Sequence, residues 1–377
     1  MIQAPQAHPS RRTFLQHTAA SMLALPALSM AQSTPTGAER SFSPQPGNWR
    51  RFEVTHRIDV LKVQGETRVW IPVPAVDSDY QRSDSNSFSS SGKVELVDDS
   101  RQGIKLLYAQ FAPGDDKPFV ELVSRVQTQN RATNWSQQPV ATQDPAALQY
   151  WTRPTALLPT DGIVRSTALQ ATQGARTDLE KAQKLYQWVV SNTYREPKVR
   201  GCGDGDIKTM LETGNLGGKC ADLNALYVGM SRSLGIPARD VYGIRLVPSA
   251  FGYKELSGNP ASLKGAQHCR AEVFLQGYGW VAMDPADVAK VMRMETPEWL
   301  KTTLHPVVAP VNKALFGGWE GNWMAYNTAH DVMLPNSRDR SLLGFFMYPA
   351  AENDAGRFDS YAPDDFRYQI TAREISA

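Results

Sequence analysis

Cys220 stands where a protein chain can present a reactive thiol. It follows a glycine pair and a lysine in GGKCADLNALYVGMSRSLGIPAR, and an apolar segment with a helical period begins directly after it. The N-terminus of a helix carries partial positive charge and unbonded N–H groups, so it stabilises a thiolate relative to a thiol. Because the thiolate is the nucleophilic form, the sequence predicts a nucleophilic cysteine at the first turn of a helix.

A histidine and an aspartate follow with the spacing of a β-hairpin. The run His268 to Leu275 alternates in polarity, Gly277-Tyr278-Gly279 supplies a turn, and a second run returns from Trp280 to Asp284. On such a hairpin His268 and Asp284 lie on neighbouring strands, opposite each other or about one step apart. The carboxylate can then hold one nitrogen of the imidazole.

These three residue types together perform nucleophilic catalysis. A thiol is mostly protonated near neutral pH, so it needs a base within hydrogen-bond reach. We expect His268 to take the proton of Cys220 and return it to the leaving group, while Asp284 fixes the imidazole tautomer. The backbone N–H of Cys220 is a natural oxyanion donor, and the sequence does not identify a second one. We therefore predict a catalytic triad of Cys220, His268 and Asp284.

Each triad candidate also has a common structural role. A cysteine at a helix start is often a small buried hydrophobe, and an aspartate before a proline often begins a turn. A histidine before a strand is often structural or exposed. The occurrence of all three in workable order within one predicted domain favours catalysis.

The two other cysteines, Cys202 and Cys269, allow two interpretations. They form a disulfide that leaves Cys220 free, or they are two unpaired buried thiols. A zinc site of the three cysteines and His268 is disfavoured, because His268 and Cys269 are adjacent on a strand and point apart. The sequence has no C-x-x-C motif and no calcium loop of the D-x-D-x-D-G type, so we expect no metal and no cofactor.

Two segments, GGKCADLNALYVGMSRSLGIPAR and HCRAEVFLQGYGWVAMDPAD, resemble the transglutaminase-like core of the papain-like superfamily. Both the helix ending in R-x-L-G-I-P-A-R and the strand ending in D-P belong to its pattern, and the resemblance covers Leu179 to Val288. It implies that Cys220 is the nucleophile, His268 the base and Asp284 the orienting acid. Arg270 departs from the pattern, because the family often has an aromatic residue there, and it predicts a more polar pocket wall.

Periodicity along the chain indicates an α+β fold, in which a papain-like, transglutaminase-core domain follows an antiparallel β-sandwich domain. Period-two runs predict strands at Phe52–Val60, Thr67–Val73, Ile104–Phe111 and Phe119–Thr128. The serine-rich stretch from 77 to 92 is expected to be an exposed loop. Helical periods begin near Leu179, and strands return after Arg239.

Composition divides the chain into six predicted segments. These are a Tat-type signal peptide (1–31), a flexible leader (32–48), an N-terminal β domain (49–132), a linker (133–175), the transglutaminase-like catalytic domain (176–295) and a C-terminal extension packed on the catalytic domain (296–377). The extension contains two strand-like runs, Gly344 to Tyr348 and Phe366 to Ile375.

The first residues predict export to the periplasm or the medium. Arg11-Arg12-Thr13-Phe14-Leu15 is a twin-arginine start, and Ser29-Met30-Ala31 offers small residues for a signal peptidase. The apolar stretch between them is too short for a membrane-spanning helix. No cysteine lies near the cleavage site, so a lipid anchor is not expected.

The charge balance argues against nucleic-acid partners. The chain has 40 Lys+Arg and 38 Asp+Glu, and Arg11 and Arg12 are the only charged residues in 1–31, so cleavage leaves 40 − 2 = 38 of each sign. No basic run is present. No later segment approaches about 20 continuous apolar residues, so no membrane insertion is expected after signal cleavage.

Four further polar residues or pairs have expected structural roles. His56 falls on the apolar face of a predicted strand and is expected to be a core residue. For His330-Asp331 a surface pair is favoured over a place in a substrate cleft. For Asp222 and Asn224, capping or packing roles are favoured over accessory catalytic ones.

The sequence thus predicts an exported cysteine-dependent enzyme that cleaves or transfers amide bonds, peptide or glutaminyl, through a thioester. The acyl donor would be a peptide, a protein or a cell-wall peptide. Water as acceptor gives a protease or amidase, and an amine gives a crosslinking acyltransferase. We favour hydrolysis, because nothing in the sequence is built to exclude water or bind a lysine. The alternative is a catalytically silent, transglutaminase-like periplasmic binding or scaffold protein.

Overall fold

The computed structural model of the 377-residue chain describes residues 40–61, 64–99, 103–115, 117–136, 143–362 and 366–375. Residues 39–377 form one compact unit. The predicted signal peptide, residues 1–31, and the first part of the predicted leader lie outside the described residues.

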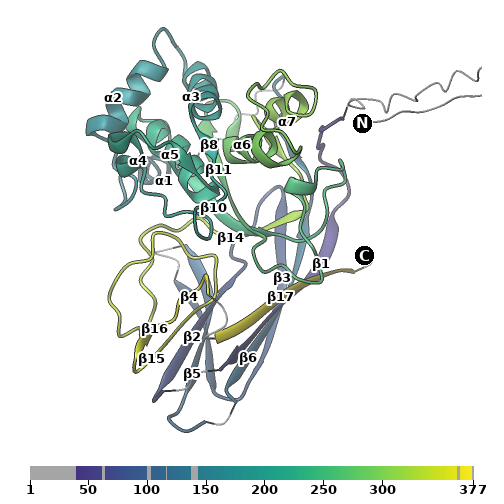
Figure 1. The fold of residues 1–377 in the computed structure, drawn as a ribbon, viewed down its shortest axis with the longest axis vertical. Helices are drawn as coiled ribbons and strands as arrows, with labels where there is room; N and C mark the ends of the chain where they lie inside the picture. Colours follow the sequence, from purple (N-terminus) through teal and green to yellow (C-terminus); the bar gives the residue numbers. More distant parts are fainter. Residues whose placement is uncertain are drawn as a thin grey trace, which may run out of the picture. The chain divides into compact units, whose positions relative to one another are not determined.

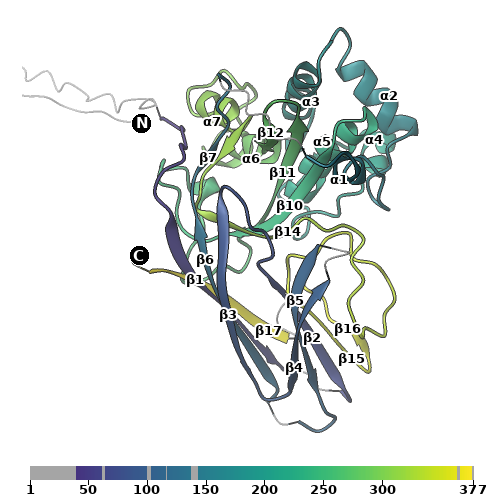
Figure 2. The ribbon, with the colours of Figure 1, turned by 180° about the vertical axis from the view of Figure 1, so that it is seen from behind.

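Two antiparallel sheets form a β-sandwich, which Figure 2 shows from behind. One sheet has the strand order β17-β1-β6-β3 and the other β16-β15-β2-β5-β4. Apolar side chains of both sheets share one core. The strands are β1 (Arg50–Val60), β2 (Thr67–Val73), β3 (Gln81–Ser90), β4 (Lys93–Asp99), β5 (Ile104–Phe111), β6 (Phe119–Thr128), β15 (Ala350–Asn353), β16 (Gly356–Arg357) and β17 (Phe366–Ile375).

Alternation in the sequence explains the sandwich strands. In β1 every second side chain is buried, and β2, β5 and β6 begin and end at the predicted residues. The expectation of a loop at 77–92 is wrong in part, because Gln81–Ser90 is a strand paired with β6. Most β3 side chains are polar and exposed, so the sequence shows no hydrophobic alternation there. The strand is held by its backbone hydrogen bonds to β6.

Helix α5 lies at the centre of the second part of the fold (Figure 1). All of its residues are buried, and it packs against the sheet β12-β11-β10-β14 and against α2, α3, α4 and α6. Within the described ranges no helix combines the length and apolarity needed to cross a lipid bilayer.

The helices are α1 (Pro145–Tyr150), α2 (Gly162–Ala171), α3 (Asp178–Asn192), α4 (Ile207–Thr213), α5 (Cys220–Ser233), α6 (Pro285–Met294), α7 (Ala309–Ala314) and the 3₁₀ helix η1 (Lys254–Leu256). The strands of this part are β7 (Arg131–Ala132), β8 (Tyr194–Arg195), β9 (Gly217–Gly218), β10 (Ala238–Arg245), β11 (Gln267–Leu275), β12 (Gly279–Met283), β13 (Gly318–Trp319) and β14 (Trp323–Asn327). Helix α2 lies inside the segment predicted as a linker and packs on α5.

The C-terminal segment joins both parts of the fold. Strand β14 completes the sheet beneath α5, whereas β15, β16 and β17 complete the sandwich. Residues 296–377 therefore do more than pack on the predicted catalytic domain. The run Gly344 to Tyr348 was expected to be a strand and is irregular, because its apolar residues Phe346 and Met347 are buried without pairing to a sheet.

Strand β17 closes one sheet of the sandwich, and its burial predicts a stability effect. Ile370 is 1% exposed and faces the sandwich core. Replacing it by alanine removes buried methyl groups and leaves a cavity, so we expect Ile370→Ala to lower the free energy of unfolding by about 2 to 5 kcal/mol in urea denaturation. The neighbouring residue Gln369 is exposed and serves as the control. Gln369→Ala is expected to change the free energy of unfolding by less than about 0.5 kcal/mol. Equal stability of the two variants would contradict the assigned register.

Candidate active site

The chain reaches Cys220 through a tight approach to helix α5. A Cβ atom on Gly218 would lie 2.6 Å from Cβ of Asp222, so this position requires glycine. Oδ2 of Asp222 accepts a hydrogen bond from the N–H of Lys219 (2.8 Å), and its Oδ1 accepts bonds from Asp204 and Gly205 (both 2.9 Å). Asp222 is therefore a capping residue, as the sequence favoured, and it ties the preceding loop to the helix.

His268 lies in β11, next to the helix start. Gly243 opposes it on β10, and a Cβ atom there would lie 2.4 Å from the ring of Trp323. The indole Nε1–H of Trp323 donates to the carbonyl oxygen of His268 over 2.9 Å. The glycine thus lets a tryptophan pack directly against the backbone that carries the imidazole.

Asp284 directly follows β12 and is the N-cap of α6. In the β11–β12 pairing Ala271 opposes Met283, so the continued register brings Asp284 opposite Arg270, two residues from His268. His268 Nε2–H donates to Oδ2 of Asp284 over 2.7 Å. The hairpin predicted from the sequence therefore brings the imidazole and the carboxylate together on one face.

The thiol of Cys220 contacts the same imidazole. The imidazole of His268 lies close enough to lower the pKa of the Cys220 thiol, and since Nε2 is bonded to Asp284, Nδ1 is the nitrogen left for the sulfur. Cys220 begins α5, so its own N–H has no acceptor within the helix. The structure brings the three predicted residues together, with the imidazole hydrogen-bonded to the carboxylate and close to the thiol.

Electrostatics at the site favour a thiolate–imidazolium pair. Burial and the charge of Arg245 oppose protonation of His268, but Asp287 and Asp284 outweigh them and raise its pKa to about 9. Burial also opposes ionisation of Cys220, yet hydrogen bonds from the neighbouring thiols and His268 hold its pKa well below the usual value. These two pKa shifts favour an ionised Cys220 sulfur beside a protonated His268 imidazole.

Asn224 supports Asp284 from helix α5. Its Nδ2 donates to Oδ1 of Asp284 (3.2 Å) and to the carbonyl oxygen of Cys269 (2.8 Å), while its Oδ1 accepts from the N–H of Ala286 (3.2 Å). The side chain is fully buried. Asn224 thus has the packing role that the sequence favoured, and it also bridges the helix of Cys220 to the Asp284 carboxylate.

Sequence reasoning missed two charged residues of the site. Oδ2 of Asp287 lies 3.3 Å from His268 Nε2, and the Arg245 guanidinium binds both oxygens of this carboxylate at 2.6 and 2.7 Å. Both side chains are buried. The signal for Asp287 was its place in the first turn of α6, three residues after Asp284, whereas Arg245 lies in an unremarkable strand.

Arg270 does not form the polar pocket wall that its position suggested. Its guanidinium lies in the core over the rings of Trp319 and Trp323, with 5.1 and 4.6 Å to the ring centroids. Its Nε lies 3.6 Å from Oδ2 of Asp284, and burial lowers its pKa to about 10. Arg270 therefore balances buried negative charge beneath the site.

Donor atoms of His268, Asp284 and Asp287 lie within 4.8 Å of one another, close enough to surround a metal ion. Their chemistry favours another role. Arg245 and Arg270 already supply positive charge to the two carboxylates, and Nε2 donates a proton to Asp284. We therefore interpret these three residues as a charge-balanced cluster in which His268 holds a proton.

All three cysteines lie in described ranges and are free, buried thiols. The Cys202–Cys269 disulfide considered from the sequence is not formed in the structure. Instead, Cys202 Sγ donates to the carbonyl oxygen of Gln267 (3.3 Å) and accepts from the hydroxyl of Tyr348 (3.0 Å). Cys202 and Cys269 also lie close enough to Cys220 to lower its pKa, so the three sulfurs form one cluster.

The reactive sulfur is covered in this structure. Cys220 is 2% and His268 4% exposed. The irregular segment that carries Met347 and Tyr348 lies over the thiol cluster, with Met347 Sδ 3.9 Å from Cys269 Sγ. Any molecule that binds at Cys220 must therefore displace part of this segment.

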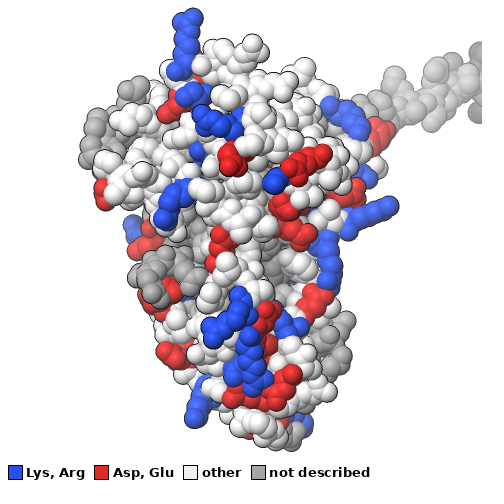
Figure 3. Space-filling view, turned by 90° about the vertical axis from the view of Figure 1, so that its left-hand side faces the viewer, with Lys and Arg blue, Asp and Glu red and all other residues white. Residues whose placement is uncertain are grey.

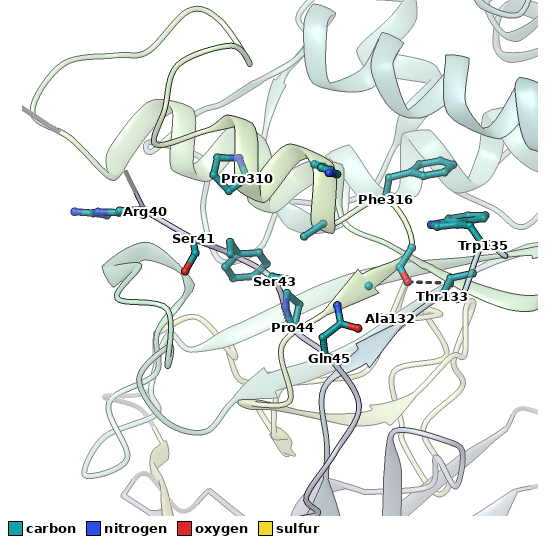
Figure 4. A pocket seen from close by; sticks show the side chains of 15 residues that line it. Arg40, Ser41, Ser43, Pro44, Gln45, Ala132, Thr133, Trp135, Pro310 and Phe316 are labelled. Atoms are coloured by element: carbon teal, nitrogen blue, oxygen red, sulfur yellow. Dashed lines mark hydrogen bonds between the residues drawn. The ribbon is translucent and has the colours of Figure 1, made fainter. Parts of the chain in front are cut away.

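Two cavities are relevant to this closure. One of about 250 Å³ is separated from the thiol cluster by Tyr348, and it is lined by Gly203, Asp204, Leu157, Leu343, Gly344, Phe345, Phe346, Tyr348, Ala350, Ser360 and Tyr361. A larger one of about 520 Å³ lies beside Trp135, Phe316 and the segment 40–45 (Figure 4). No residue of the predicted triad lines either cavity. The smaller one is the candidate route to the sulfur, because its lining residue Tyr348 donates a hydrogen bond to Cys202.

The remaining predicted histidines lie away from Cys220. His56 is fully buried, its Nε2 is 2.7 Å from the Tyr326 hydroxyl, and burial lowers its pKa to about 3, which confirms the core role. His330 pairs with Asp240 (3.2 Å) and not with Asp331. The surface pair favoured from the sequence is therefore not formed.

Comparison with known proteins identifies similar chains. Residues 165–285 match the family model of the transglutaminase-like superfamily. A protein of Haemophilus influenzae that is described as uncharacterized is 33% identical over 343 residues, which cover 86% of this chain and 91% of that protein.

Solved structures give a similar result. A candidate cysteine protease from Cytophaga hutchinsonii is 14% identical and has a TM-score of 0.55, with 88% of this chain and 93% of that chain covered. The periplasmic domain of TgpA from Pseudomonas aeruginosa is 17% identical, with a TM-score of 0.35 and coverage of 74% and 100%. The Cytophaga likeness, together with the family match, confirms the predicted α+β fold with a β-rich region before the core.

The bridge made by Asn224 predicts a stability effect. Asn224→Ala removes three buried hydrogen bonds and leaves polar groups of Asp284, Cys269 and Ala286 without this partner. We expect the free energy of unfolding to fall by about 1 to 3 kcal/mol in urea denaturation. Asn192→Ala, at the exposed end of α3, is the matched control and is expected to have a much smaller effect. Equal effects would contradict the bridging role.

Proposed function

Because this chain belongs to the transglutaminase-like superfamily, we propose that it is a cysteine-dependent enzyme that cleaves or transfers amide bonds. In this proposal Cys220 is the nucleophile, His268 the general base and Asp284 the orienting acid. The observation that supports it best is the hydrogen bond between the His268 imidazole and the Asp284 carboxylate, with the Cys220 thiol close enough to the same imidazole for His268 to lower its pKa.

The proposed first step is acyl transfer to sulfur. The Cys220 thiolate attacks the carbonyl carbon of the amide, and the N–H of Cys220 donates to the oxygen that becomes negative. His268 returns its proton to the leaving nitrogen as the C–N bond breaks. An amine departs, and a thioester remains on Cys220.

The proposed second step returns the enzyme to its starting state. His268, now neutral, takes a proton from the acceptor as the acceptor attacks the thioester carbonyl. Cys220 leaves as a thiolate, and the imidazolium forms again beside it. We propose water as the acceptor, because hydrolysis requires no second binding site, while an amine acceptor would make the enzyme an acyltransferase.

We further propose that the protein is exported and acts on a peptide, a protein or a cell-wall peptide. The twin-arginine sequence at the N-terminus supports export. The molecular face in Figure 3 carries Lys and Arg interspersed with Asp and Glu, unlike the basic patch that binds a nucleic acid. The cavity next to Cys202 has mostly apolar and aromatic lining, and Asp204 is its single charged lining residue, which suits a peptide side chain.

The enzymatic proposal predicts a specific loss of activity. The chain without residues 1–31 is incubated with periplasmic peptides, glutamine-containing proteins and peptidoglycan fragments, and mass spectrometry detects cleavage, ammonia release or crosslinking. We expect Cys220→Ala and His268→Gln to lower turnover at least about 10³-fold, since both act in bond formation.

The matched control is His330→Gln, which breaks another buried histidine–aspartate pair and is expected to retain turnover. Full turnover by Cys220→Ala would contradict the proposed nucleophile. Binding of a panel member without turnover by the wild-type chain would favour the silent binding protein instead.

The export proposal predicts the effect of two conservative substitutions. Twin-arginine export depends on the arginine pair, so Arg11→Lys with Arg12→Lys should retain the full-length chain inside a bacterial host. Wild-type chain should be recovered from the periplasm with a new N-terminus after Ala31. Cell fractionation and N-terminal sequencing provide the measurement, and equal export of both chains would contradict a Tat signal.

A further inference from the structure

Asp287 is a buried carboxylate for which the proposed triad has no role. It is 1% exposed, and its Oδ2 lies 3.3 Å from Nε2 of His268. The same nitrogen donates to Asp284 over 2.7 Å, so two carboxylates face one imidazole edge. Burying a second carboxylate is costly unless it is paired, and this position therefore requires an explanation.

Charged groups from four elements face His268. Helix α5 contributes Cys220, β10 contributes Arg245, β11 contributes Arg270, and the start of α6 contributes Asp284 and Asp287. With sulfur, Asp284 and Asp287 ionised, three negative charges face the three positive charges of His268, Arg245 and Arg270. The buried cluster is then neutral, and removing Asp287 leaves one uncompensated positive charge.

The two carboxylates are held in different ways. Asp284 accepts from His268, from Asn224 and from the N–H of Asp287 (3.1 Å), so it is fixed by groups that orient it. Asp287 is held by Arg245, which binds both of its oxygens at 2.6 and 2.7 Å. Both bonds come from the same nitrogen, Nη2, and a charge-assisted contact of this kind keeps the carboxylate ionised and in place. Asp284 is therefore suited to aim the imidazole, and Asp287 to supply a permanent charge.

We propose that Asp287, clamped by Arg245, is a positioning residue that keeps His268 protonated beside the Cys220 thiolate. This inference rests on the proposed function of Cys220 and His268. Asp287 acts through the imidazole and does not touch the reacting carbonyl. Its charge sets the upper pH at which the thiolate–imidazolium pair exists.

The sign of the effect follows from Coulomb's law. A negative charge beside an imidazolium favours the protonated form, so its removal lets the proton leave at lower pH. Burial and Arg245 oppose protonation in the wild-type chain, and Asp287 and Asp284 together raise the pKa of His268 to about 9. Asp287→Asn preserves the side-chain shape and removes the charge.

Iodoacetate is the probe for this effect. It is an anion that alkylates a thiolate and is attracted by an adjacent imidazolium, so its rate falls when His268 loses its proton. Carboxymethylation of Cys220 is followed by mass spectrometry from pH 4 to 10, with each variant's rates normalised to its own maximum. In the wild-type chain the rate should fall near pH 9, and this part of the curve of rate against pH is its falling limb. In Asp287→Asn it should move to lower pH by about one unit or more.

Glu272→Gln is the matched control. Glu272 is another buried carboxylate of β11, it is paired with Arg131 and Arg239, and it does not face the imidazole. We expect this variant to lose stability and to keep the wild-type falling limb. Neutral iodoacetamide provides a second control, because its rate should not fall at high pH.

The outcomes separate this inference from the proposed function. A wild-type falling limb that is unchanged in Asp287→Asn would overturn the role of Asp287 alone. A wild-type Cys220 that reacts only above its ordinary pKa of about 8.5 would overturn the proposed function as well.

A second pair of variants covers a failure of Asp287→Asn to fold, since that variant leaves Arg245 buried and unpaired. The falling limb of Arg245→Gln is then compared with that of the double variant Arg245→Gln/Asp287→Asn. Neither variant leaves the Arg245 guanidinium buried without its carboxylate partner. The proposal expects the limb of the double variant to lie about one unit lower. Equal limbs would assign Asp287 a purely structural role.

Discussion

The hydrogen bond between His268 and Asp284 is the constraint on which the site depends. It joins the first residues of β11 to the cap of α6, and it leaves the other imidazole nitrogen for the sulfur at the start of α5. Buried in a low dielectric, such a bond between charged groups is strong, and it is costly to leave unmade. Asn224, Asp287 and Arg245 are explained by this requirement, because each fixes or balances a partner of the bond.

Burial of the charges makes the rest of the fold necessary. Helix α5 is enclosed on all sides, and the C-terminal segment crosses from the sheet beneath it to the sandwich, where β17 pairs with β1. On its way this segment covers the thiol cluster with Met347 and Tyr348. The sandwich is therefore tied to the site by the chain that shields the sulfur from water.

Local patterns in the sequence were sufficient for much of this structure. Strands β2, β5 and β6 have the residues that alternation predicts. The prediction failed where the pattern carries no information. Strand β3 is polar on both faces, and the apolar run Gly344 to Tyr348 is buried without strand pairing, because tertiary contacts and not periodicity decide its conformation.

The amino-acid sequence alone determined the helix start and the hairpin that carry Cys220, His268 and Asp284, since both depend on neighbours in the chain. Only the tertiary structure decided the charge environment. Arg245 and Asp287 meet across 42 positions, and Arg270 lies between tryptophans that the sequence does not link to it. Electrostatic energies depend on the distances between charged groups and on their burial. The protonation states of His268 and Cys220 therefore follow from the tertiary structure and not from the order of residues in the chain.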